Sequence, residues 1–301
     1  MTSNHHHGMM QKKAESFFLP FFVFLSKFSL MSRYFSNKKH RSYSKKKDAK
    51  STSWEPIAED YHKIVQSDGH YYHREVILPK LLPLLDVKSE DILVDVGCGQ
   101  GVLERVLPKE CGYLGIDISP SLISIARKLR RSPSHEFIVS DLTKTLRIEN
   151  TRSFSTAVAI LSLQNMEAPD RAMANVARLL CDQGRFFIVL NHPCFRIPRV
   201  SSWHYDEDKK LFSRKIDRYL SNMTIPIIAH PGKKQSESSI SFHFPLSYWT
   251  QALSKHGFLI QSMEEWVSPK KSIGTRAKAE NVSREEFPLF LLISCIKTHK
   301  N

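Results

Sequence analysis

The sequence predicts an α/β protein built on a doubly wound, mostly parallel sheet. Two observations carry this prediction. Short apolar runs, which suit buried parallel strands, alternate with segments in which apolar residues recur at helical spacing. The first run leads into three closely spaced glycines, Gly97, Gly99 and Gly101, and then into a helical pattern. A strand, a glycine turn and a helix start in this order are typical of a ligand-binding edge at the carboxyl ends of the strands.

The strand before the glycines covers residues 92–96 and carries one acid, Asp95. Residues 102–107 predict the start of the following helix. We expect backbone N–H groups of the turn and the positive end of the helix dipole to face a ligand. Glycine suits the turn because it tolerates unusual dihedral angles and brings no side chain that would hold a ligand away. The spacing is G-x-G-x-G, whereas dinucleotide-binding turns have G-x-G-x-x-G. A plain strand-to-helix turn is the alternative.

Two further apolar runs, at residues 113–117 and 136–142, carry an acid at or near their ends. Asp117 lies 22 positions after Asp95, and Asp141 stands in the later run. An acid about 20 residues beyond a glycine turn can accept hydrogen bonds from ribose hydroxyls. The three strand-plus-acid patterns together resemble the class I S-adenosylmethionine-dependent methyltransferases. Within that class, the quinone-biosynthesis type (methyltransferase type 11) is the nearest resemblance.

The resemblance implies S-adenosyl-L-methionine as the cofactor and S-adenosyl-L-homocysteine as the product. In the resembled family, the acid after the second strand binds the adenosyl ribose. The acid after the third strand meets the adenine amino group, and the next residue packs on the ring. Carried over to this sequence, the resemblance places at the cofactor Asp95, Gly97, Cys98, Gly99, Gly101, Asp117, Ile118, Asp141, Leu142, Leu161 and Tyr72.

The resemblance covers residues 54–298 and implies a Rossmann-like sheet of seven strands with an antiparallel last strand. A basic and polar loop at 267–286 is expected between the last two strands. The expected strands lie at residues 92–96, 113–117, 136–142, 154–163, 185–190, 258–266 and 287–297.

Three helices are predicted from their ends and spacing. Ser119 as N-cap, with Pro120 at the first helical position, predicts a helix start. A helix over residues 171–180 is expected to end at Gly184 in the manner of a C-cap. A third helix is expected over residues 246–256.

Residues 1–53 are expected to form a basic, disordered extension of the methyltransferase domain at 54–301. They carry 11 Lys/Arg and 2 Asp/Glu, which gives +9 of the total net charge of +14. The apolar stretch at 17–25 is too short to span a bilayer, so no integral membrane span is expected. A membrane-touching segment, a targeting segment and an upstream extension all stay open. Contact between the basic run at 38–50 and nucleic acid is an alternative to a solvated tail, which is favoured.

The cysteines argue against a disulfide framework and against a metal site. There are five, an odd number, and none forms a Cys-x-x-Cys pair. This usage favours a cytoplasmic protein. Cys98, within the glycine turn, is expected to be a small filler rather than a nucleophile.

Two segments are expected to build the acceptor side of the site. Residues 54–85 resemble a helical lid over the cofactor. Residues 191–245 form a long insertion after the fifth strand, and connections of this length are usually functional. The acceptor-binding residues expected are Gln164, Asn191, Arg196, Trp203 and Tyr205. Histidines can act as general bases because their reference pKa is near 6.5; the candidates are His192, His204 and His73. A homodimer contact is the alternative role of the insertion.

These patterns predict an enzyme that transfers a methyl group from S-adenosylmethionine to a small-molecule acceptor. Methylation of RNA or protein is an alternative, supported by the basic extension. A non-catalytic scaffold that only binds the cofactor is a third reading. The intact glycines and acids argue against the scaffold.

Overall fold

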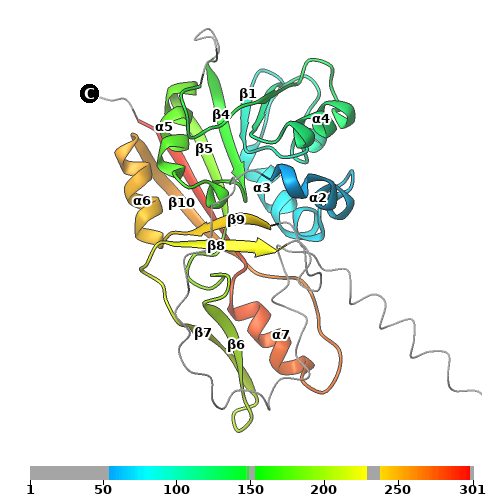
Figure 1. Ribbon diagram of the computed structural model, residues 1–301, viewed down its shortest axis with the longest axis vertical. Helices are drawn as coiled ribbons and strands as arrows, with labels where there is room; N and C mark the ends of the chain where they lie inside the picture. The colour runs from blue at the N-terminus through cyan, green and yellow to red at the C-terminus, as the bar shows by residue number, and fades with distance from the viewer. Residues whose placement is uncertain (1–53, 147, 149–152, 229–237, 299–301) are drawn as a thin grey trace, which may run out of the picture.

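A seven-stranded sheet forms the upper part of the computed structural model as drawn in Figure 1; the structure describes residues 54–146, 148, 153–228 and 238–298. Its strand order is β10-β11-β5-β4-β1-β2-β3. Neighbouring strands are parallel except at β11, which is antiparallel to both β5 and β10. The predicted doubly wound sheet with an antiparallel last strand is thus confirmed. The strands are β1 Ile92–Val96, β2 Gly112–Asp117, β3 Glu136–Val139, β4 Phe154–Ile160, β5 Leu180–Asn191, β10 Phe258–Trp266 and β11 Phe290–Lys297.

Helices cover both faces of the sheet, with α5 and α6 on one side and α3 and α4 on the other (Figure 1). Successive side chains of β1 point to opposite faces of the sheet. Val94 packs in the core under α5 and α6, and Leu93 packs in the core under α3 and α4. Both side chains are fully buried, as expected for a central parallel strand. These helices are α3 Leu78–Leu85, α4 Pro120–Leu129, α5 Pro169–Leu179 and α6 Leu246–Lys255.

The start of α4 confirms the capping prediction. Ser119 has extended backbone angles, and its hydroxyl accepts a hydrogen bond from the N–H of Leu122 at 3.2 Å. Pro120 occupies the first helical position, where its missing N–H is not needed. Because Ser119 follows two residues after Asp117, the cap also fixes the end of β2.

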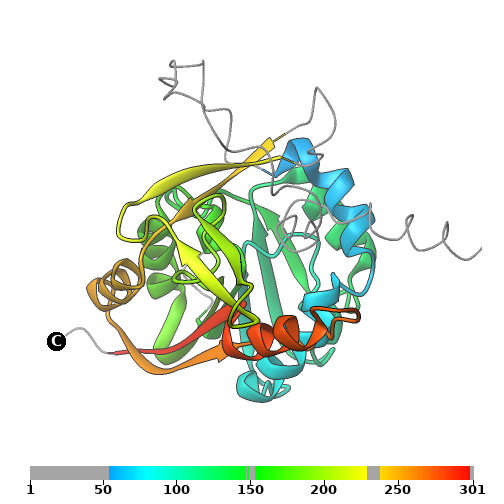
Figure 2. The same cartoon turned by 90° about the horizontal axis from the view of Figure 1, so that it is seen from below.

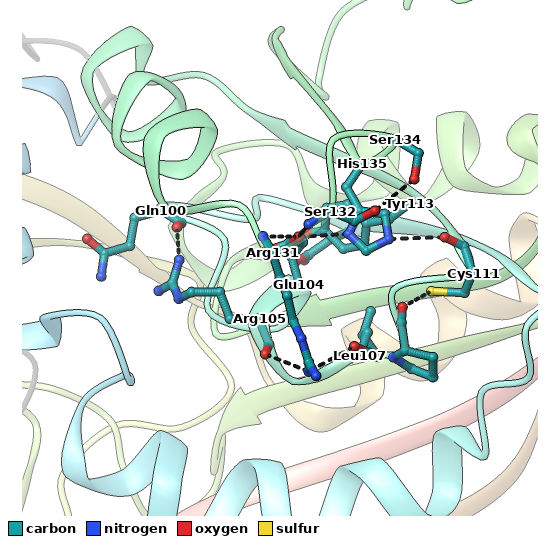
Figure 3. Close-up of polar contacts among 12 residues, drawn as sticks. Gln100, Glu104, Arg105, Leu107, Cys111, Tyr113, Arg131, Ser132, Ser134 and His135 are labelled. Carbon is teal, nitrogen blue, oxygen red and sulfur yellow. Dashed lines mark hydrogen bonds and ion pairs between the residues drawn. The ribbon is translucent and has the colours of Figure 1, made fainter.

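The prediction of a helix after the glycine turn is wrong, because only a three-residue 3-10 helix, η3 (Glu104–Val106), forms there. Pro108 follows two residues after the end of η3 and lacks an N–H for a continuing helix. The carboxylate of Glu104 turns inward and accepts hydrogen bonds from Nδ1 of His135 (2.7 Å) and the N–H of Arg131 (2.7 Å) (Figure 3). Glu104 and His135 are both fully buried. A buried polar cluster therefore holds this segment where a helix was expected.

Two other predictions of local structure are also wrong. Gly184 does not cap a helix: α5 ends at Leu179, and Gly184 lies inside β5 at an irregularity in its pairing with β4. A Cβ on Gly184 would lie 2.8 Å from the carbonyl oxygen of Cys181, so the close turn requires glycine. The connection 267–286 is not only loop, because it contains α7 (Ala277–Glu286).

The insertion after β5 folds into two antiparallel hairpins, β6–β7 and β8–β9. Seen from below (Figure 2), the hairpins and α7 lie in front of the sheet. α7 packs against β7, and β9 packs against η4 and against the 3-10 turn η1 (Glu55–Ile57). The insertion therefore has one part beside α7 and another part next to the lid. The strands are β6 Ser201–Asp206, β7 Leu211–Ile216, β8 Met223–Ile228 and β9 Ser238–His243, and η4 is Leu163–Asn165.

The lid consists of four short helical pieces that lead into β1. A 3-10 turn and α2 come first, and a five-residue π-helix joins α3 without a break. No helix within the described part of the chain is long and apolar enough to cross a membrane. The predicted extension 1–53 lies outside the described residues. The new pieces are η1 Glu55–Ile57, α2 Ala58–Val65 and η2 His73–Ile77.

Candidate active site

A cavity of about 560 Å³ opens at the carboxyl ends of β1, β2, β3 and β4, beneath the lid. The lid contributes side chains from η1, α2 and η2, and the sheet contributes the residues that follow the four strands. Nine of the residues predicted for the site line it: Tyr72, His73, Gly97, Gly99, Asp117, Ile118, Asp141, Leu142 and Leu161.

The glycine turn is shaped by close approach of its neighbours. Gly97 has φ +73°, and a Cβ there would lie 2.5 Å from Cβ of Ser162. Gly101 has φ +77°, and a Cβ there would lie 3.0 Å from the ring of Phe137. Both positions therefore need glycine for space as well as for backbone conformation.

The N–H groups of the glycines do not point at a ligand, contrary to the prediction. The N–H of Gly97 donates to the carbonyl of Ile116 at 2.8 Å, and the N–H of Gly101 donates to the carbonyl of Cys98 at 2.9 Å. The N–H of Gly99 donates to Oδ2 of Asp117 at 2.9 Å. The turn thus offers a ligand a close backbone surface rather than a set of free donors.

Asp117 joins the turn to α4 and faces the cavity. Its Oδ2 accepts from Gly99, and its Oδ1 accepts from the N–H of Ser119 at 2.9 Å. Burial raises the pKa of Asp117, and hydrogen bonds from the backbone of Ser119, Gly99 and Ile118 oppose the rise. A carboxylate can accept about four hydrogen bonds. The carboxylate is therefore held in one orientation with capacity left for donors of a ligand.

Asp95 and Cys98 lie behind the cavity wall. Oδ2 of Asp95 accepts a hydrogen bond from the hydroxyl of Tyr113 at 2.7 Å, and burial raises the pKa of Asp95 to about 7. Burial also raises the pKa of the Cys98 thiol, which keeps it protonated. A Cβ on Gly115 would lie 2.9 Å from Sγ of Cys98, so the thiol fills a tight space beside β2. Asp95 and Cys98 are therefore placed to support the glycine turn from behind rather than to contact a ligand.

Asp141 and Leu142 form the wall after β3. Oδ1 of Asp141 accepts from the N–H of Thr143 at 2.9 Å, and Lys144 lies 3.2 Å from Oδ2. Burial raises the pKa of Asp141, but the hydrogen bonds from Thr143 and Lys144 outweigh it and hold the pKa below its ordinary value. Asn175, which the sequence analysis missed, donates to the carbonyls of Leu142 (2.9 Å) and Lys144. α5 therefore fixes the loop that carries Asp141.

Leu161 carries backbone strain at the end of β4. Its φ is +54°, a left-handed conformation that costs a leucine about 1 kcal/mol or more. The N–H of Leu161 donates to the carbonyl of Val189 at 2.8 Å, and the hydroxyl of Ser162 donates to the carbonyl of Val96. These bonds hold the strained residue against the cavity.

Hydrogen bonds from the lid to the glycine turn were not predicted. Nδ1 of His62 lies 2.6 Å from Oε1 of Gln100, and Nε2 of Gln100 donates to the carbonyl of Gln66. Arg105 donates to the carbonyls of Ser67 and Gln100, both at 2.6 Å. Gln100 and Arg105 therefore clamp the end of α2 onto the turn. No local sequence signal marks such long-range pairs.

The acceptor-side residues predicted at the end of β5 are held within the protein. Oε1 of Gln164 accepts from the N–H of Asn191 at 2.8 Å, and Asn191 pairs with β11. His192 is buried, and its Nε2 lies 2.6 Å from Oε1 of Glu265 on β10. Nδ1 of His192 accepts from the N–H of Cys194, so both ring nitrogens are engaged. Burial lowers the pKa of His192.

Three of the remaining predicted residues, Arg196, Trp203 and Tyr205, lie beside α7 and the segment that follows it. Arg196 donates to the carbonyls of Pro288 and Phe287, and its guanidinium lies 5.4 Å from the ring centroid of Trp203. Tyr205 packs on Phe212, and the guanidinium of Arg276 lies over its ring. His204 is exposed on the opposite face of β6. Among the described residues that line the cavity, none comes from this group.

The strand order, the glycine turn and the acids at the ends of β2 and β3 define a Rossmann-like fold of the methyltransferase type. Residues 94–186, which run from β1 into β5, match the family described as a methyltransferase domain. Residues 94–186 therefore match a methyltransferase domain, and the sheet around them has the fold of the class I S-adenosylmethionine-dependent methyltransferases.

Individual relatives are similar over parts of the chain. An uncharacterized methyltransferase of Schizosaccharomyces pombe is 30% identical over 139 residues, 43% of this chain and 51% of the relative. An uncharacterized protein of Methanocaldococcus jannaschii is 29% identical over 138 residues, 45% of this chain and 52% of the relative. This chain thus spans about half the length of these curated relatives. The solved structure of an S-adenosylmethionine-dependent methyltransferase from Mesorhizobium loti superimposes with a TM-score of 0.55 at 25% identity, covering 73% of this chain and 96% of that one.

Proposed function

We propose that the protein transfers a methyl group from S-adenosylmethionine to a small-molecule acceptor. The observation that carries the proposal is the position of Asp117. It lines the cavity at the end of β2, next to Gly97 and Gly99, and retains acceptor capacity. An acid placed in this way suits the ribose hydroxyls of an adenosyl group.

The residues around Asp117 fit the rest of the cofactor. The glycine turn leaves room for its backbone to approach a ligand, since the nearest atom to a Cβ on Gly99 would be 3.9 Å away. We assign Asp117 to the ribose, and Ile118 and Leu142 to the two faces of the adenine. Asp141 would accept a hydrogen bond from the adenine amino group.

Bound there, S-adenosylmethionine supplies a methyl group activated by its sulfonium charge. The protein must then align the acceptor, exclude water and accept or release a proton where the acceptor requires it. The lid is suited to excluding water because α2 is clamped to the glycine turn through Gln100 and Arg105. The residues that follow β4, including the strained Leu161, border the same space.

The size of the cavity supports a small acceptor. Sites for small molecules commonly measure about 300–1,000 Å³ and bury most of the ligand. The lid covers the strand ends, and β9 packs beside it on η1 and η4. A polymer would have to enter under these elements. The five cysteines are unpaired thiols, which supports a cytoplasmic location.

Calorimetry with S-adenosylhomocysteine tests the proposal. The wild-type chain should bind it. Asp117→Asn should weaken binding about tenfold, because the amide NH₂ replaces one of the two oxygens that can accept a hydrogen bond from a ribose hydroxyl of the ligand. Asp208→Asn, an exposed acid on the β6–β7 turn, is the matched control and should leave affinity unchanged. A folded wild-type protein that ignores S-adenosylhomocysteine and binds NAD instead contradicts the proposal.

A further inference from the structure

Two histidines of the lid line the cavity with their protonation pattern fixed by the backbone. The N–H of His70 donates to Nδ1 of His73 at 3.2 Å, and the N–H of Tyr72 donates to Nδ1 of His70 at 3.3 Å. An N–H can donate only to an unprotonated ring nitrogen. The proton of each neutral ring therefore sits on Nε2, which makes Nε2–H a donor.

Both rings stay neutral at physiological pH. Burial lowers the pKa of His70 to about 4, with Lys270 and Arg74 adding to the effect. Burial likewise lowers the pKa of His73 to about 4, with His70 and Arg105 adding to it. The basic nitrogen of His73 is also occupied by a backbone N–H. His73 is therefore a poor general base, in contrast to the role expected from the sequence.

The position of His73 is tightly defined. It opens the π-helix η2, and single π-turns are frequent at functional sites. Gly69 has φ +91°, and a Cβ there would lie 2.9 Å from Cγ1 of Val102 and 3.0 Å from Cβ of His73. The lid thus packs His73 close to the segment that follows the glycine turn.

Positive charge lies near both histidines. Arg105 helps to lower the pKa of His73, and Lys270 and Arg74 help to lower the pKa of its neighbour His70. Arg74 donates to the carbonyl of Gly69 and Arg105 to the carbonyl of Ser67, contacts that leave the positive charges in place. An N–H donor in a positive field binds an oxyanion more strongly than a neutral oxygen.

We propose that Nε2–H of His73 donates a hydrogen bond to a carboxylate of the ligand in the cavity, so that His73 is a binding residue. The inference rests on the proposed methyltransferase function. Two ligands can bring the carboxylate: the methionine part of the cofactor or the methyl acceptor. The chemistry recognised is the same, and the two sources are separable by experiment.

The test uses two variants of the full chain. His73→Phe keeps a ring for packing but has no donor, and His73→Gln restores an N–H near the position of Nε2. The probes are S-adenosylhomocysteine and 5′-methylthioadenosine, which lacks the amino acid part. His204→Phe, at an exposed position on β6, is the control and should match the wild type.

If the carboxylate belongs to the cofactor, His73→Phe should lower the affinity for S-adenosylhomocysteine roughly tenfold and leave the affinity for 5′-methylthioadenosine within about twofold of the wild type. His73→Gln should then retain the affinity for S-adenosylhomocysteine. A carboxylate from the acceptor predicts unchanged binding of both probes. Transfer of labelled methyl from S-adenosylmethionine to extract metabolites retained on an anion exchanger should then fall in His73→Phe and recover in His73→Gln.

The proposal is overturned if His73→Phe changes neither binding nor transfer. It is also overturned if both variants lose turnover alike and abolish a pH dependence seen in the wild type, since a general base would behave so. In both cases the wild type still binds S-adenosylhomocysteine. Failure of the wild type to bind either probe would instead reject the methyltransferase function.

Discussion

The carboxylate of Glu55 in the lid accepts a hydrogen bond from the hydroxyl of Ser119 at the start of α4. Oε2 of Glu55 also accepts from the N–H of Ser121 at 3.1 Å. The acid therefore lies at the positive end of α4, where the helix dipole favours it. Since the N–H of Ser119 donates to Asp117, one chain of contacts joins the lid to the predicted ribose acid.

Replacing Glu55 should loosen this connection. Glu55→Ala is expected to weaken S-adenosylhomocysteine about fivefold, because about 1 kcal/mol of lid attachment is lost. Glu59→Ala is the matched control, since Glu59 is exposed in the same lid and should have no effect. Calorimetry on both variants measures the difference. Equal affinities would show that the lid does not depend on the Glu55–Ser119 contact.

Alanine substitutions at two glycines of the turn distinguish the effect of steric crowding from that of backbone strain. Gly97→Ala should cost about 3 kcal/mol or more, because its Cβ would clash with Ser162 at 2.5 Å and φ is positive. Gly99→Ala meets nothing closer than 3.9 Å and should cost only about 1–2 kcal/mol from its φ of +55°. Denaturant unfolding compares the two. A Gly97→Ala protein as stable as Gly99→Ala would contradict the packing described for the turn.

Asp95 predicts a pH-dependent stability difference. Burial raises the pKa of Asp95 to about 7, so between about pH 4 and 7 the folded chain holds a proton that the unfolded chain has lost. Stability due to this group therefore falls as the pH rises through that range. Asp95→Asn carries no such proton. The free energy of unfolding of this variant, relative to that of the wild type, should therefore be about 2–4 kcal/mol higher at pH 8 than at pH 4.

Unfolding curves across pH measure this gain. Asp208→Asn, an exposed acid, should run parallel to the wild type at every pH. Asp95→Asn curves that also run parallel to the wild type would show that Asp95 is ionised throughout.

The buried pair of Glu104 and His135 should matter for stability rather than for the site. Glu104→Ala removes the acceptor used by His135 and by the N–H groups of Arg131 and Ser132. Leaving them buried without a partner should cost about 3–5 kcal/mol, seen as a lower melting temperature. Glu110→Ala, at an exposed position nearby, should change stability by less than about 0.5 kcal/mol. A stable Glu104→Ala protein would mean that the cluster in Figure 3 contributes little.

The parts of the fold that the sequence predicted correctly depend on neighbours in the chain. The acids Asp117 and Asp141 end or follow short apolar strands, and parallel strands bring such ends to one edge. The contact between Glu55 and Ser119 joins residues 64 positions apart, so no local pattern reveals it. α7 was missed because its sequence is polar, with only Ala279 and Ser283 buried.

The insertion shows the same limit. Its aromatic residues suggested an acceptor pocket, but Trp203 packs on Phe287 and Phe212 between β6 and the segment after α7. Only tertiary contacts decide whether an aromatic cluster lines a pocket or a small core. The part of the insertion next to the site is β9, which packs on η1 and η4.

The most direct test of the central claim follows the methyl group itself. Full-length protein is incubated with methyl-labelled S-adenosylmethionine and separate metabolite, RNA and protein fractions of a cell extract. Label is expected in the metabolite fraction, reduced in Asp117→Asn at a limiting concentration of S-adenosylmethionine and retained in Asp208→Asn. Label in RNA or protein alone, or no transfer to any fraction by a chain that binds S-adenosylhomocysteine, would contradict it.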